Sequence, residues 1–175
     1  LAVELAEQRE HFRGGLAVEV AGGFVGQQQC RSADQRARHR DTLLLAISRG
    51  RQGYGLAWAD LSAGRFLVSE VGNDDALAAE LARLAPAEVL VADEEGWPPA
   101  VIAATGLRRR AAWYFDGETC RRQLLRFFGL HDLSGFGLED KPLAVGAAGA
   151  LLGYVEETQK QRLPHLTAIA FEAAD

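Results

Sequence analysis

Methionine does not occur anywhere in the 175-residue sequence, not even at position 1. This absence predicts that the chain is a piece of a longer protein. Cysteine occurs only twice, and the spacing of Cys30 and Cys120 fits neither a metal site nor a disulfide framework. Scarce, isolated cysteines are typical of a reducing compartment, so we expect a cytoplasmic location.

Long apolar runs and an excess of positive charge are also lacking. No stretch approaches the roughly 20 apolar residues that cross a bilayer, so no membrane partner is expected. The formal net charge of -5 argues against a surface that grips DNA phosphates over most of its area. The composition, 48% hydrophobic and 25% charged, is that of a soluble globular domain.

The common catalytic motifs are absent as well. The sequence has no Walker A loop, no G-x-S-x-G elbow and no H-E-x-x-H pair, and its four histidines are scattered singly. We therefore expect no P-loop ATP site, no serine nucleophile elbow and no H-E-x-x-H zinc site in this chain.

Local signals for secondary structure are consistent from Tyr54 onward. Residues 54–61 and 65–70 alternate as a hairpin, and "GNDDALAAELARLAP" predicts a helix capped by Asn73 and closed by Pro86. The apolar run 87–93 then predicts a buried strand.

The second half continues the alternation of strands and helices. A strand is expected within 106–115, after the arginines, followed by a helix from Asp116 to Gly129. A long helix starts near Pro142 and ends at Leu163-Pro164, and 165–172 resembles a final strand. The order β-β-α-β-(α)-β-α-α-β predicts an α/β domain with a mixed sheet flanked by helices.

Residues 1–40 do not share this quality. They contain short apolar runs but no convincing period, cap or turn signal. We therefore divide the chain into an N-terminal segment, 1–40, and a domain, 41–175.

Asp60 offers the strongest catalytic candidate. An RNase H-type nuclease places an aspartate on its first strand and gathers further carboxylates around metal ions about 4 Å apart. The possible partners are Asp93, Asp116 and Asp132. The alternative is structural, because an aspartate at the start of a hairpin turn readily bonds the turn backbone.

Two arginine-rich stretches are candidates for binding. Arg108, Arg109 and Arg110 could contact phosphate, or could form a solvated edge. In the helix that follows, one polar face could dock a partner protein, or could simply be solvated; its members are Arg121, Arg122, Gln123 and Arg126.

Several motifs in order resemble the connector domain of the bacterial mismatch-repair protein MutS. The most specific are D-x-S-x-G-x-F at 60–66, F-G-x-x-D-L-x-G-F-G at 128–137, and T-Q-x-x-x-L-P-H-L at 158–166. "DTLLLAI" at 41–47 and "GLRRRAAWYFD" at 106–116 also match, so the resemblance runs from about Asp41 to Phe171.

The resemblance implies an RNase H-like fold without a nuclease site, and therefore no catalytic residue, no cofactor site and no metal site in this chain. In the family, this domain joins the mismatch-binding and ATPase parts, helps transmit the nucleotide state to the DNA clamp, and offers a docking surface for MutL. It implies that Asp60 shapes a turn, and that Arg122 and Gln123 occupy the MutL-facing helix. Many relatives carry glutamine at the first of these two positions, so Arg122 is a departure.

The same resemblance implies what this chain does not do alone. ATP and Mg²⁺ belong to the ATPase domain, and mismatched DNA is bound through the full-length protein, its mismatch-binding domain and its dimer partner. Upstream of Arg40 the family pattern stops abruptly, which suggests that "QQQCRSADQRARHR" is read from a shifted frame or is otherwise foreign to the domain. Sequencing the gene tests this hypothesis, which fails if no alternative frame restores the family pattern.

Overall fold

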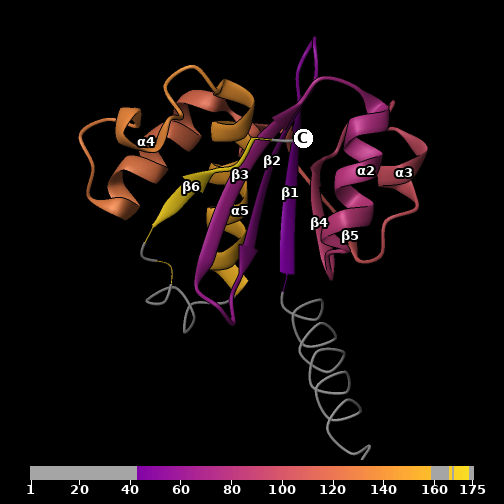
Figure 1. Cartoon of the computed structure of the whole chain (residues 1–175), viewed down its shortest axis with the longest axis horizontal. Coiled ribbons are helices and arrows are strands. Elements are labelled where there is room, and N and C mark those ends of the chain that lie inside the picture. Colours follow the sequence, from indigo (N-terminus) through magenta and orange to yellow (C-terminus); the bar gives the residue numbers. More distant parts are fainter. Residues whose placement is uncertain (1–42, 159–165, 167, 174–175) are drawn as a thin grey trace, which may run out of the picture.

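The computed structural model describes residues 43–158, 166 and 168–173. In this part of the chain, six strands form one mixed sheet in the order β5-β4-β1-β2-β3-β6 (Figure 1). The predicted segment 1–40 and the expected helix end at Leu163-Pro164 lie outside the described residues.

An antiparallel meander makes up the centre of the sheet. It consists of β1 (Leu43–Arg49), β2 (Tyr54–Asp60) and β3 (Arg65–Val71). Asp60 at the end of β2 pairs with Leu43 at the start of β1 and with Arg65 at the start of β3. The predicted hairpin is therefore confirmed.

Parallel strands extend the meander on both sides. β4 (Glu88–Ala92) pairs with β1, and β5 (Leu107–Arg110) pairs with β4 at one edge. At the other edge β6 (Ile169–Phe171) pairs with β3. The mixed α/β sheet flanked by helices is confirmed, and a meander continued by parallel strands is the RNase H-like arrangement that the resemblance implied.

Helices cover the two faces of the sheet. α2 (Asp74–Leu84) and the short α3 (Pro99–Ile102) pack on one face, while α4 (Gly117–Phe128) and α5 (Pro142–Thr158) lie on the other (Figure 1). Two short 3₁₀ helices, η1 (Ala112–Phe115) and η2 (Ser134–Phe136), flank α4 in the chain.

The period of two along the central strands separates two hydrophobic cores. In β1, Leu43, Leu45 and Ile47 face α2 and α3, whereas Leu44 and Ala46 face α5. Six of the seven β1 residues are buried, so this strand has no polar face.

Two expectations about strands need correction. β1 was not predicted: it is an apolar run like 87–93, but no Gly or Pro marks its start as Pro86 does for that run. The strand expected after the arginines instead contains them: β5 includes Arg108–Arg110, and the aromatic residues that follow form η1. Each arginine of this edge strand lies within 4 Å of a carboxylate, on Glu88, Asp93 and Glu157 respectively, as expected for a solvated edge.

Candidate protein-interaction site on α4 and α5

Helix α4 is capped at both ends by neighbouring residues. The Asp116 carboxylate caps its N-terminus by accepting a hydrogen bond from the Thr119 backbone N–H at 2.9 Å. Hydrogen bonds from the Thr119 side chain and backbone lower the pKa of Asp116 below its ordinary value. Gly129 ends the helix in the left-handed conformation, with φ of 66°. Both predicted boundaries are confirmed.

The inner side of α4 packs unusually close to α5. A methyl group placed on Gly149 of α5 would lie 2.3 Å from Cβ of Cys120, so only glycine permits this approach. The Cys120 Sγ lies 3.4 Å from the Gly146 carbonyl oxygen, also on α5. Burial raises the pKa of the Cys120 thiol to about 11, so the thiol is neutral in the folded protein. This contact fixes how far α4 stands from α5.

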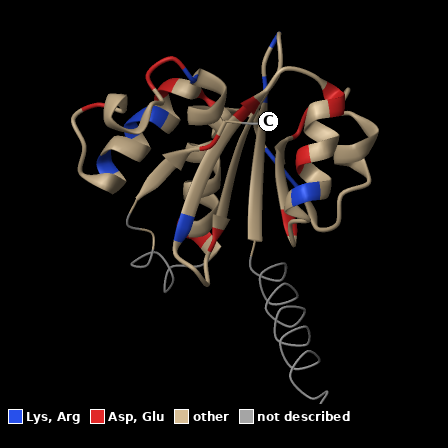
Figure 2. Cartoon of the chain, viewed as in Figure 1, with Lys and Arg blue, Asp and Glu red and all other residues tan. Residues whose placement is uncertain are grey.

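The outer side of α4 carries the four residues that the sequence singled out. Arg122, Gln123 and Arg126 line one shallow hollow together with Thr119. Arg121 does not line it, because one helical step turns its guanidinium toward Glu139, at 3.6 Å. Blue segments recur along α4 in Figure 2. The structure thus brings three of the four predicted residues together.

Gln123 is tied down from the neighbouring helix. Its Nε2 donates a hydrogen bond to a carboxylate oxygen of Glu156 at 2.8 Å. A methyl group on Gly153 of α5 would lie 3.2 Å from the same Nε2 atom, so the side chain has little room to move. Arg122 and Arg126 are exposed, and no carboxylate of the described residues is within ion-pair distance of either.

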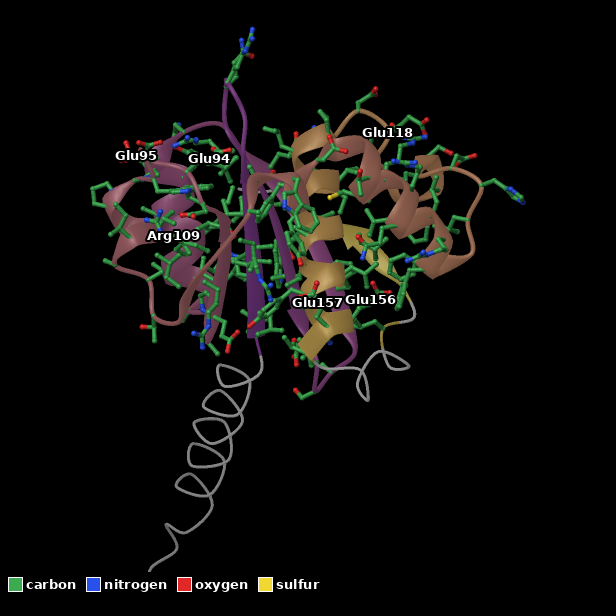
Figure 3. The ribbon with its side chains drawn as sticks, turned by 180° about the vertical axis from the view of Figure 1, so that it is seen from behind. Glu94, Glu95, Arg109, Glu118, Glu156 and Glu157 are labelled. Atoms are coloured by element: carbon green, nitrogen blue, oxygen red, sulfur yellow. The ribbon has the colours of Figure 1, made fainter. Side chains whose placement is uncertain are left out.

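A second hollow, which we call the Trp113 groove, adjoins the first and was not predicted. It has a volume of about 440 Å³ and is lined by Trp113, Tyr114, Thr119, Gln123, Gly153, Glu156 and Glu157. Thr119 and Gln123 also line the hollow with Arg122 and Arg126, which we call the α4 hollow, so the two hollows adjoin. Figure 3 shows Glu156 and Glu157 next to each other on α5.

Trp113 is the most exposed large apolar side chain described, at 66%. Its ring stacks on Tyr114 with centroids 4.0 Å apart. The Tyr114 hydroxyl donates to Glu157 at 2.8 Å, and this bond raises the pKa of Tyr114 above its ordinary value. The sequence signal for this groove is the aromatic cluster "AWYF", which forms η1 rather than the strand expected within 106–115.

Asp60, the catalytic alternative, serves the hairpin turn. One carboxylate oxygen accepts hydrogen bonds from the backbone N–H groups of Ser62, at 2.9 Å, and Ala63, at 3.0 Å. The Ser62 hydroxyl donates to the same oxygen at 2.6 Å. These are the bonds of an Asx turn, as the structural interpretation predicted.

The carboxylates proposed to join Asp60 in a metal site lie elsewhere or are used locally. Asp60 pairs with the first residue of β1. Asp93 directly follows β4, and the end of β4 lies beside the end of β1, so the two aspartates are at opposite ends of the sheet. The seven residues of β1 span about 20 Å, which is the distance along the strands between Asp60 and Asp93. Asp116, the α4 cap, lines a hollow with Ser48 and Arg49 at that same far end.

The remaining candidate, Asp132, accepts a hydrogen bond from the Ser134 backbone N–H at 3.0 Å and so shapes its own turn. In the part of the chain described, no three His, Cys, Asp or Glu side chains are grouped so that they could hold a metal ion. The described helices also include none with the length and apolar character to cross a membrane.

The chain is similar to known proteins both in sequence and in structure. A family model described as MutS domain II matches residues 42–167, which include every described element from β1 to α5. The structure of T. thermophilus RuvC in complex with a Holliday junction substrate is similar with a TM-score of 0.46 and 14% identity, over 67% of this chain and 96% of the RuvC chain. The family match covers well over half of the 175 residues, and the chain therefore belongs to the MutS domain II family, the connector domain of MutS.

Proposed function

We propose that this chain is the connector module of a DNA mismatch-repair MutS protein and that it docks MutL through α4. The module links the mismatch-binding and ATPase parts and performs no chemistry of its own. ATP, Mg²⁺ and mismatched DNA are then handled by the full-length protein and its dimer partner, in the cytoplasm.

The mechanical part of this proposal is supported by how the sheet is built. A connector that transmits movement must resist bending, and here the strands are fixed by side chains packed on both faces. Helices α4 and α5 are tied to the sheet through the same core, so a force on α4 is transmitted to the strands rather than absorbed by a loose helix.

The observation that carries the docking proposal is the exposed α4 surface at the family's MutL-facing positions. Arg122 is exposed there, while Gln123 is held in one orientation by Glu156. A surface with fixed side chains binds with less loss of conformational entropy than a mobile one.

The proposal is tested by titrating the full chain with purified MutL and, separately, with matched and mismatched duplexes. We expect MutL to bind, and we expect neither duplex to be preferred. Because the described part of the chain groups no three His, Cys, Asp or Glu side chains that could hold a metal ion, we also expect no duplex cleavage with Mg²⁺ present. Mismatch selectivity, or absence of MutL binding, would contradict the proposal.

A further inference from the structure

We propose that the partner surface seated on α4 carries an acidic strip and an apolar side chain, with the strip on Arg122 and Arg126 and the apolar side chain against Trp113. This inference rests on the proposed docking function and specifies the chemistry of the partner. It concerns one surface, formed by the adjoining α4 hollow and Trp113 groove.

The first argument is the placement of charge. Arg122 and Arg126 are four residues apart on one helix, a spacing at which like charges repel. Neither has a carboxylate within ion-pair distance in the described residues, although many other basic side chains do: Arg49, Arg83, Arg108, Arg109, Arg110, Arg121 and Lys141. Two exposed arginines one turn apart without such a partner form a positive patch that complements carboxylates on a partner surface.

The acidic residues nearest this surface offset that charge only in part: Asp116, the α4 cap, is stabilised by the charge of Arg122 but forms no ion pair with it, and it accepts from Thr119. Glu156 accepts from Gln123, and Glu157 accepts from Tyr114 and lies 3.2 Å from Arg110. Glu118 is one turn before Arg122, but the Arg122 Nε points to the Glu118 backbone carbonyl, at 3.5 Å, rather than to its carboxylate.

The second argument is Trp113. Tryptophan, tyrosine and arginine are the residue types that dominate binding energy at protein interfaces, and this surface presents all three. The Trp113 ring is exposed yet supported by its stack on Tyr114, so burying it costs little side-chain freedom. An apolar partner side chain in the adjoining groove would cover the ring and exclude water.

The test measures acrylamide quenching of the Trp113 fluorescence. The chain has three tryptophans, and the other two, Trp58 and Trp97, are each only 4% exposed, so acrylamide quenches Trp113 first. The full chain is titrated with MutL, with a soluble glutamate-rich peptide carrying one phenylalanine, and with the same peptide in which glutamine replaces glutamate. We expect MutL and the glutamate peptide to protect Trp113, and the glutamine peptide to do so at least about 10-fold more weakly.

Substitutions distinguish a specific contribution of this surface to MutL binding from a general effect of net charge. Arg122→Gln with Arg126→Gln should weaken MutL binding about 10-fold and flatten its salt dependence. The matched control is Arg51→Gln with Arg65→Gln, which removes the same charge from two exposed arginines that also have no ion pair in the described residues but lie outside both hollows. Trp113→Ala should cost about 30-fold in affinity by calorimetry, and Trp113→Phe should cost much less.

Each outcome is decisive. Equal MutL binding by all variants overturns this inference and leaves the proposed function in place. Equal losses from the two arginine pairs also overturn it, since binding then follows net charge alone. If MutL does not bind but the glutamate peptide does, with the expected arginine dependence, the partner is wrong and the surface chemistry stands. If neither binds, the inference fails.

Discussion

At the scale of single residues, the hydrogen bonds of Asp60 assign it to the turn after β2. Three donors converge on one carboxylate oxygen of this buried side chain: the backbone N–H groups of Ser62 and Ala63, and the Ser62 hydroxyl. The left-handed Gly64, with φ of 66°, completes the reversal. The side chain therefore contributes to the stability of the hairpin.

This role predicts the effect of Asp60→Ala. We expect the free energy of unfolding to fall by about 1–3 kcal/mol, because three hydrogen bonds to a charged carboxylate are lost, although the exposed donors of Ser62 and Ala63 can then bond water. Urea denaturation measures the loss. Ser62→Ala is the matched control and should cost less, since it removes one of the three bonds. An Asp60→Ala variant as stable as the parent would contradict the assignment.

Cys120 gives a second prediction at this scale. Since burial raises its pKa to about 11, the reactive thiolate is scarce at pH 8 and alkylation by iodoacetamide should be slow. In a Cys30→Ser background Cys120 is the only cysteine, and its reaction in urea gives the rate for an exposed thiol. The rate should rise steeply as the pH approaches 11 while the protein stays folded. Equal rates at pH 8 in folded and unfolded protein would show that the thiol is not buried.

At the scale of elements, the contact between α4 and α5 depends on a glycine. Gly149→Ala forces a methyl group against both Cα and Cβ of Cys120, where backbone atoms must shift. We expect a loss of roughly 1–3 kcal/mol or more in the free energy of unfolding, the usual cost of overpacking.

Gly117→Ala is the control for this element. It is the first residue of α4, a methyl group there meets nothing within 4 Å, and its φ is not positive. This change should leave stability unchanged or raise it slightly, because alanine favours the helix. Equal thermal unfolding of the two variants would contradict the close approach.

The elements also show which local signals were sufficient. Asn73 and Asp116 cap their helices as predicted, each accepting from a backbone N–H three residues on. Such caps are encoded by neighbouring residues, and so is the Asx turn at Asp60. Sequence reasoning works where the physical cause lies within a few residues.

The elements that were missed depend on tertiary context. β1 is buried on both faces and no glycine or proline marks its start, and β5 tolerates three arginines because it is an edge strand with carboxylates nearby. The Trp113 groove could not be derived locally, since η1, α4 and α5 each contribute to it. The arginine stripe was visible in the sequence, but the separation of Arg121 from the others depends on the position of Glu139.

At the scale of the whole molecule, the two faces of the sheet have different surroundings. α2 and α3 cover one face, with Arg83 of α2 paired to Glu80 and Glu172. α4 and α5 cover the other and present the adjoining hollows with Trp113, Arg122 and Arg126. A rigid sheet between them suits a module that receives a partner on one side and transmits the effect through its core.

The most direct test of this account is amide hydrogen exchange of the full chain with and without MutL. We predict slower exchange in 112–126 and at the end of α5, with α2 and α3 unchanged on the opposite face. Protection confined to α2 and α3, or none at η1 and α4, would contradict the claim that the α4 surface is the docking site.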